Sequence, residues 1–279
     1  MLRKLVKIVL GLIVTVLLLA GAGFLYALSL TRSLPWQKPV FETERPADPG
    51  AIGAKGVLIF SKTNGFRHES IEPGLAALQK TGQARGWDVR ATENGAFFND
   101  EYLKRFKVVV FLSTTGDVLT PEQEQAFERF IENGGGYVGI HSASDTEYNW
   151  QWYDQMLGTH FRDHTLYPDH TPEAEIRTDA PAHPTTRHLP ARWGKTDEWY
   201  NFKQSVRGKN RIQVLLTLNE QSYVAKWPKA MEGDHPISWT NTVGKGRIFY
   251  TGLGHTPETF TDPNAMPHIV AGIEWAGQF

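Results

Sequence analysis

The stretch GGGYVGIHSASD, residues 134–145, shows most directly how this chain folds. Three glycines end whatever precedes them, a short apolar run follows at 137–140, and the chain turns polar at His141. A short apolar run bounded by turn residues is typical of a strand that is buried on both faces. The stretch therefore predicts a buried parallel strand whose end places a histidine in a turn.

Other short apolar segments alternate with helical ones along the rest of the chain. The pattern predicts helices over residues 70–85, 121–132 and 264–276, and further buried strands over residues 57–60, 107–112 and 246–251. Strands that are apolar throughout and alternate with helices indicate a mainly parallel sheet with helices on both faces. The predicted fold is therefore α/β and flavodoxin-like, with its ligand crevice at the carboxyl ends of the strands.

Residues 148–240 show less order and are rich in aromatic residues, prolines and histidines. Strands are expected within this region at 173–178 and 213–218. The spacing of His160 and His164 would place both on one face of a helix, although a nearby glycine and proline argue against a long helix. No internal repeat is present in the sequence. A single domain with a long insertion accounts for this pattern better than two domains.

The first 30 residues contain a long apolar segment. Three basic residues, Arg3, Lys4 and Lys7, precede residues 8–30, which carry no charge over 23 positions. About 20 apolar residues span a bilayer, whereas the apolar core of a signal peptide usually has about 7–15. We therefore predict an uncleaved signal anchor over residues 1–30, with a cleaved signal peptide as the alternative.

The basic residues before the apolar segment also predict a topology. By the positive-inside rule they place the remainder outside the cytoplasm, on the periplasmic side if the cell is Gram-negative. Residues 31–55 contain four prolines and no sustained periodicity, so we interpret them as a tether. Residues 56–279 are then expected to form the folded domain of a single-pass protein of the cell membrane.

Overall composition excludes several classes of function. The chain has no cysteine, which excludes disulfides, thiolate metal sites, a cysteine nucleophile and a lipoprotein anchor. The formal net charge is −1 and the basic residues are scattered, so the sequence does not indicate a nucleic-acid partner.

The histidines are unevenly placed, and nine of the ten lie at or after position 141. His68, His141 and His255 each follow an apolar strand, so all three should converge on one edge of the sheet. Neutral imidazole is a common metal ligand and titrates near neutral pH. The expected cluster is therefore a metal site, a general acid–base site, or both.

The segment DEWYNF, residues 197–202, adds two carboxylates beside aromatic residues. If one of the pair, Asp197 and Glu198, is buried, it could orient a histidine, bind a metal or act as a base, whereas an exposed pair would simply be solvated. The neighbouring Trp199 and Tyr200 could stack on sugar rings, although packing in the core is the more common role of aromatic residues.

Together these segments resemble the ThuA-like (trehalose-utilisation) family over roughly residues 56–279. The matching stretches are GFRHESI (65–71), GGGYVGIHSASD (134–145), GTHFRDH (158–164), HPTT (183–186), DEWYNF (197–202) and HPISWTNTVGKGRIFYTGLGH (235–255). The resemblance implies a class I glutamine-amidotransferase-like fold. In active amidotransferases of that fold a cysteine occupies the turn where this chain has His141, so glutamine hydrolysis through a thioester is excluded.

The resemblance implies a role in the metabolism of trehalose and similar disaccharides, in company with dehydrogenases that make 3-keto-glycosides. It carries six residues over to the family's pocket: His68, His141, His164, His183, Glu198 and His255. We expect an extracytoplasmic, membrane-tethered enzyme acting on a carbohydrate, whether as hydrolase, lyase or isomerase. A keto group acidifies the neighbouring C–H bond, so a histidine base and a metal or imidazole would suffice.

Roles follow for individual residues. We predict His141 as a catalytic base or ligand and Glu198 as its acid–base partner. His164, His183 and His255 are predicted metal ligands, and zinc is the first metal to test because a His/carboxylate set without cysteine suits it. Nickel and manganese are alternatives. The residues predicted to bind substrate are His68, Asp145, Trp199 and Tyr200.

Two other classes of function fit the same residues. One is a non-catalytic carbohydrate-binding or scaffold domain, in which the turn has lost its nucleophile but the pocket is kept. The other is a structural membrane-anchored partner of a sugar oxidoreductase. The sequence does not specify an oligomeric state.

Overall fold

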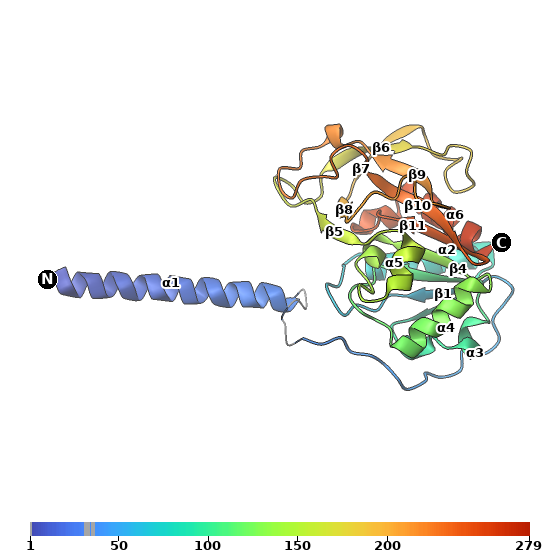
Figure 1. Cartoon of the computed structure of the whole chain (residues 1–279), viewed down its shortest axis with the longest axis horizontal. Coiled ribbons are helices and arrows are strands. Elements are labelled where there is room, and N and C mark those ends of the chain that lie inside the picture. The colour runs from blue at the N-terminus through green and yellow to red at the C-terminus, as the bar shows by residue number, and fades with distance from the viewer. Residues whose placement is uncertain (1, 31–33, 35–36) are drawn as a thin grey trace. The chain divides into compact units, whose positions relative to one another are not determined.

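The computed structural model describes residues 2–30, 34 and 37–279 (Figure 1). Its α-helices are α1 (Leu2–Leu30), α2 (Ile71–Arg85), α3 (Asp100–Leu103), α4 (Pro121–Glu132), α5 (Gln151–Leu157) and α6 (Ala265–Gly277). Its strands are β1 (Gly56–Phe60), β2 (Asp88–Thr92), β3 (Val108–Leu112), β4 (Gly136–Ile140), β5 (Phe161–His164), β6 (Glu173–Thr178), β7 (Arg192–Thr196), β8 (Tyr200–Phe202), β9 (Gln213–Leu218), β10 (Pro236–Val243) and β11 (Gly246–Thr251).

A nine-stranded mixed sheet runs through the domain in the order β2-β1-β3-β4-β11-β10-β9-β6-β7. Strands β2, β1, β3, β4 and β11 pair in parallel, whereas β10, β9, β6 and β7 extend the sheet with antiparallel pairs. Strands β5 and β8 form a separate antiparallel ribbon. The predicted α/β fold is confirmed, and its parallel part contains the strands that the apolar runs indicated.

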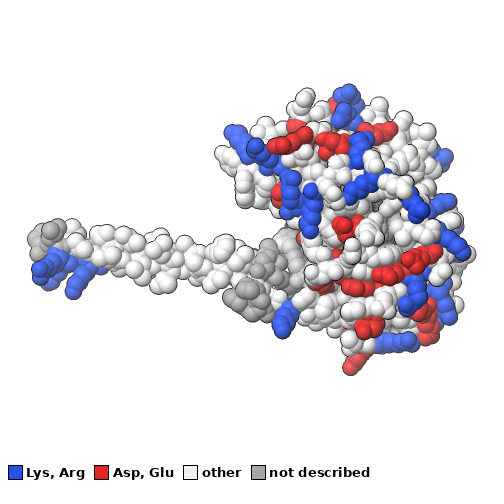
Figure 2. Space-filling model, in the orientation of Figure 1, with Lys and Arg blue, Asp and Glu red and all other residues white. Residues whose placement is uncertain are grey.

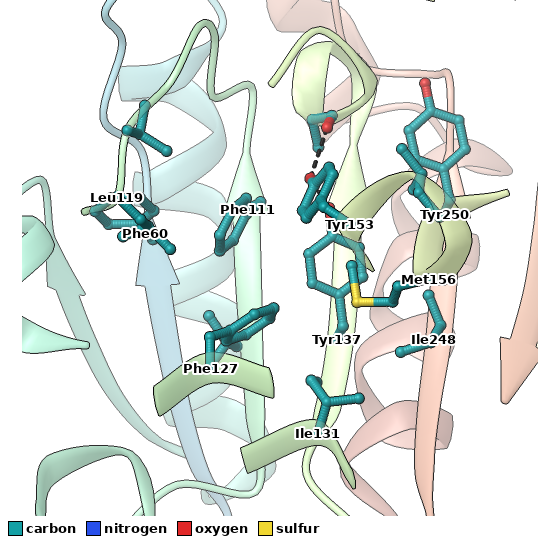
Figure 3. Close-up of a cluster of buried hydrophobic side chains, with 14 of the residues drawn as sticks. Phe60, Phe111, Leu119, Phe127, Ile131, Tyr137, Tyr153, Met156, Ile248 and Tyr250 are labelled. Atoms are coloured by element: carbon teal, nitrogen blue, oxygen red, sulfur yellow. Dashed lines mark hydrogen bonds between the residues drawn. The ribbon is translucent and has the colours of Figure 1, made fainter. Parts of the chain in front are cut away.

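The central strands are buried on both faces because apolar side chains alternate between two cores. On one face Phe111 and Tyr137 pack against Phe127 of α4 and Tyr153 of α5 (Figure 3). On the other face the intervening side chains pack against α2 and α6. Burying one such side chain stabilises a fold by about 1.5–3 kcal/mol. This double burial explains why β1, β3 and β4 have no exposed residue.

Helix boundaries follow local signals in the sequence. Helix α4 begins at Pro121 behind a capping box, in which Thr120 and Gln123 each bond the other's backbone N–H. Helix α2 ends at Gly86, which takes the left-handed backbone conformation with φ 69°. Proline at a helix start and glycine just past its end are the expected signals. Both predicted boundaries are confirmed within one residue.

The less ordered region 148–240 supplies α5 and most of the antiparallel extension. The strands expected at 173–178 and 213–218 are β6 and β9. The HFRDH segment is not helical, since it forms β5 and pairs with β8. The spacing of His160 and His164 therefore does not place them on one helix face.

The N-terminal part separates from the rest in the pattern of contacts. Residues Met1–Pro39 form one unit and Val40–Phe279 the other. Within the first unit, Arg3–Ser29 is long and apolar enough to cross a membrane. Of the expected tether, residues 31–33, 35 and 36 lie outside the described residues. Residues 40–55 belong to the second unit, where Val40 donates to Asn64 at 3.1 Å.

Candidate metal centre

The turn after β4 has an unusual backbone. His141 takes a φ of 51° and begins a short 3-10 helix, His141–Ser144. A residue other than glycine in this left-handed region costs about 1–3 kcal/mol and persists only where its surroundings enforce it. Here Tyr250 donates a hydrogen bond to the His141 carbonyl at 2.8 Å. Gly254 allows the neighbouring loop to approach, because a Cβ there would lie 2.8 Å from Ile140.

Four side chains meet at this turn, at the carboxyl edge of the parallel strands. His68, His141, Glu198 and His255 each offer one ligand atom, and these atoms all lie within 4.8 Å of one another. The ring centroids of the three histidines are 4.7 to 5.3 Å apart. They follow β1, β4 and β11, and the predicted convergence of these strand ends is confirmed. This His₃Glu group can hold a metal ion.

The surroundings of the ring nitrogens of His141 and His255 are those expected of metal ligands. His141 Nδ1 lies 2.9 Å from the carbonyl oxygen of Gly252, and a carbonyl only accepts, so Nδ1 carries the proton. His141 Nε2 therefore faces the cluster, 3.4 Å from Glu198. Neither this nitrogen nor His255 Nδ1 has a hydrogen-bond partner among the described residues. Metal-binding histidines show this arrangement, with the second ring nitrogen donating to a carbonyl.

Charge in the cluster is concentrated on one carboxylate. Burial alone would raise the pKa of Glu198, but the imidazoles of His141, His164 and His255 outweigh it and hold that pKa well below its usual range. Burial, together with the like charges of His141 and His255, lowers the pKa of His68 well below its ordinary value. The cluster therefore offers a carboxylate and a neutral imidazole, which are the protonation states that bind metals.

His164 and Tyr200 flank the four ligands. His164 Nδ1 lies 3.0 Å from Glu198 Oε1; burial lowers its pKa, but Glu198 outweighs burial and raises the pKa above its ordinary value. The ring of Tyr200 packs 4.2 Å from that of His141, and its hydroxyl lies 3.5 Å from His68 Nε2. His164 therefore borders the cluster through its contact with the Glu198 carboxylate.

Asp145 lies at the end of the same turn. Burial raises its pKa to about 6, against the opposing effects of Tyr148, His141 and His164. Tyr148 donates a hydrogen bond to it at 2.6 Å. A carboxylate with this pKa changes its charge near physiological pH and can accept a proton there.

Two residues predicted for the site lie elsewhere. His183 bonds Thr185 Oγ1 through Nδ1 at 2.9 Å, and its ring packs 5.3 Å from that of Trp275 on α6. Trp199 is buried in the core, where its indole N–H donates to the carbonyl of Pro172 at 2.8 Å. The structure therefore assigns His183 to the surroundings of α6 and Trp199 to packing.

Asp197 is a residue of the site that the sequence analysis named beside Glu198 without giving it a role of its own. This fully buried carboxylate accepts hydrogen bonds from the backbone N–H groups of Gly254, His255 and Thr256 at 3.0 to 3.3 Å. It also accepts from Thr259 Oγ1 at 3.0 Å. Asp197 thus holds the loop that presents His255. Its position beside Glu198 was the only available signal, since the partner loop lies more than 50 residues away.

These features define an α/β protein with a His₃Glu centre at the carboxyl edge of its parallel strands. The family model described as ThuA, trehalose utilisation, matches residues 56–276. The chain belongs to this family.

Solved structures of two family members resemble the chain. A ThuA-like protein from Bacteroides uniformis is 26% identical, with a TM-score of 0.67 over 84% of this chain and 95% of that one. One from Parabacteroides merdae is 20% identical, with a TM-score of 0.61 over 80% and 89%.

A beta-galactosidase from Bacillus circulans sp. alkalophilus shares the fold alone, at 14% identity and a TM-score of 0.51. That match covers 81% of this chain and 32% of the galactosidase. No curated protein is similar enough to match this chain.

Proposed function

We propose that this protein is a membrane-anchored enzyme that acts on carbohydrates, specifically 3-keto-glycosides, through a divalent metal held by the His₃Glu group. The observation that carries the proposal is the pair of buried nitrogens, His141 Nε2 and His255 Nδ1, facing Glu198 without a hydrogen-bond partner among the described residues. Leaving buried polar atoms unpaired costs about 1–3 kcal/mol each. A bound cation would satisfy both nitrogens, and we propose zinc.

The reaction needs a proton acceptor and a stabilised oxyanion. In a 3-keto-glycoside the carbonyl acidifies the adjacent C–H bond, so removal of that proton leads to isomerisation or elimination. A bound metal would supply Lewis-acid stabilisation of the developing oxyanion. With His141 and Glu198 serving as ligands, Asp145 is the base that we propose, since it lies at the end of the turn after β4. His164 is the proposed donor to the leaving oxygen.

The proposed location follows from the N-terminal helix. The segment Arg3–Ser29 suits a membrane span, and the basic residues before it favour a cytoplasmic N-terminus. We propose that the folded domain lies outside the cytoplasm and stays attached to the membrane. Sequencing the N-terminus of the mature protein tests this: a chain beginning after residue 20 would contradict the anchor.

Metal analysis of the full-length protein in detergent is the decisive test. We expect one equivalent of zinc per chain, lost in His141→Ala and unchanged in His183→Ala. The protein should turn over a 3-keto-glycoside, and the metal-depleted protein should not until zinc returns. No bound metal combined with no turnover would overturn the proposal in favour of a carbohydrate-binding or scaffold domain.

A further inference from the structure

Exposed aromatic side chains gather on the segments that carry the metal centre. Phe66 packs edge-on against His68, with ring centroids 4.9 Å apart. Tyr148 is exposed and donates its hydroxyl hydrogen bond to Asp145. Scattered exposed apolar side chains are ordinary on protein surfaces, but a group around a polar pocket marks a binding surface.

Tyr167 and Trp227, here called the aromatic pair, are the most exposed of these rings. They are 58% and 64% exposed. An antiparallel bridge joins their two loops, since Tyr167 N donates to Trp227 O and Lys226 N donates to Tyr167 O, both at 3.0 Å. Lys226 Nζ lies 5.9 Å from the centre of the Tyr167 ring. The bridge holds the backbone of both rings in place before a ligand binds, which reduces the entropy lost on binding.

The loop of Tyr167 is tied directly to the metal centre. It begins after His164, which contacts Glu198. Thr165 Oγ1 donates to the carbonyl of His170 at 2.7 Å, and the His170 ring lies 5.9 Å from that of the ligand His255.

The loop of Trp227 is tied to the ribbon formed by β5 and β8. The carbonyl of Lys229 accepts hydrogen bonds from Arg162 at 2.9 Å and from Asn201 at 3.3 Å. Asn201 follows Tyr200, whose ring packs against His141. Both loops of the aromatic pair are therefore anchored on elements that also carry residues of the centre.

We propose that the aromatic pair is a subsite for a second sugar ring, next to the unit whose reacting carbon faces the metal centre. Trp and Tyr present flat apolar faces with a polar edge, which suits the C–H face of a pyranose, and Lys226 offers a donor for hydroxyl groups. The inference rests on the proposed function, because it takes the reacting sugar to lie at the centre.

A membrane surface is the competing occupant, because Trp, Tyr and Lys also gather at lipid interfaces. The hydrogen bonds and ring contacts that link both loops to the metal centre favour a sugar over lipid as the occupant. His164, which contacts Glu198, lies three residues before Tyr167, so the aromatic pair continues the same segment that borders the metal centre. A sugar chain extending from the centre would instead cover the aromatic pair while its first unit reacts.

The test compares a 3-keto-disaccharide with the matching 3-keto-monosaccharide, using the full-length protein in detergent. In Trp227→Ala and Tyr167→Ala we expect KM for the disaccharide to rise about tenfold, as loss of one stacked ring predicts. The kcat should change less than twofold, and KM for the monosaccharide should stay unchanged. Val224→Ala, which removes an exposed aliphatic side chain near Trp227, is the matched control and should behave as wild type.

Distinct results overturn the subsite and the proposed function. Unchanged disaccharide KM in both variants, or equal effects on the two substrates, overturns the subsite alone. A second result also overturns the subsite. The full chain is placed in vesicles of brominated phosphatidylcholine, which quench the fluorescence of tryptophans that lie in lipid. If Trp227→Phe abolishes part of this quenching, the Trp227 ring lies in lipid. Wild-type protein that turns over neither substrate overturns the proposed function and the subsite with it.

Discussion

Two groups of three histidines occupy different parts of this protein, and their surroundings differ. His68, His141 and His255 meet at the carboxyl edge of the sheet, with one carboxylate among them. The second group lies near α6 and comprises His183, His188 and His268. His268 of the second group is as fully buried as His141 of the first, so burial alone does not distinguish a candidate metal centre from structural histidines.

The difference lies in the partners of the ring nitrogens. In the second group, His268 Nδ1 bonds the carbonyl of Thr185 at 2.8 Å and its Nε2 lies 2.9 Å from Ser238 Oγ. Both nitrogens of His268 are therefore paired, and burial lowers its pKa to about 4. In the first group, nitrogens of His141 and His255 face Glu198 without a hydrogen bond among the described residues. Ring nitrogens that face a carboxylate without a hydrogen bond, more than the number of histidines, distinguish the candidate metal centre.

The surface of the domain carries charges of both signs. Basic and acidic side chains are interspersed over the face of the domain drawn in Figure 2, without one large patch of a single sign. A mixed face of this kind provides little long-range steering of a charged substrate.

The largest effect is expected from Glu198→Gln, which keeps the shape of the side chain but removes its charge. Without the carboxylate, three imidazoles remain as ligands, and we expect zinc affinity to fall by more than about 100-fold, beyond the 10–100-fold typical of outer-shell changes. Competition titration against a chelator measures this. An affinity within a few-fold of wild type would contradict the assignment of Glu198 as a ligand.

Asp197→Asn should weaken metal binding by about 10–100-fold, because the loop that carries His255 loses the carboxylate that holds it. Asp154→Asn is the matched control, since it changes a carboxylate beside His160. Unfolding of the metal-free variants, followed in parallel, separates the affinity from general destabilisation. Equal zinc affinity in Asp197→Asn and wild type would show that the loop does not depend on Asp197.

His268→Gln should change how stability depends on pH. The pKa of His268 is lowered to about 4 in the folded protein, so between pH 6.5 and 4 the unfolded chain binds more protons. Stability from this group is therefore present above pH 6.5 and is lost as pH falls toward 4, by about 1–3 kcal/mol. Urea unfolding of metal-free wild type and variant at pH 7 and pH 5 measures the difference. An identical pH dependence in both proteins would show that His268 is not kept neutral.

The smallest effect is expected from His183→Ala. His183 contacts Thr185 and Trp275 in the second group, so zinc content and zinc affinity should match wild type. Loss of metal in this variant would remove the distinction between the two groups of histidines. Thermal unfolding of the same sample checks that the variant is folded.

Much of the fold could be predicted from the sequence because its signals are local. The apolar runs at β1, β3 and β4 and the helix signals at Pro121 and Gly86 act within a few residues. The antiparallel extension was predicted only in part, since β6 and β9 were expected but β7 and β10 were not, and neither was the separate ribbon of β5 and β8. Short strands in that region depend on pairing with distant partners, as β5 does with β8.

The residues of the candidate site could also be predicted only in part from the sequence. The sequence by itself determined that His68, His141 and His255 follow strands of one parallel sheet, and such strand ends must meet at one edge. It could not separate His183 from that set, because a histidine in a loop carries no local sign of where the loop packs. Trp199 was equally ambiguous, since both a sugar-binding surface and a core use tryptophan.

Only the tertiary structure decided which nitrogens are paired. Whether His141 Nε2 faces the cluster depends on Gly252, 111 residues away, whose carbonyl oxygen accepts a hydrogen bond from the other ring nitrogen. Whether His255 reaches Glu198 depends on the bonds that Asp197 makes to its loop. Local sequence sets which strand ends carry histidines, whereas hydrogen bonds between distant segments set which of those histidines remain available to a metal.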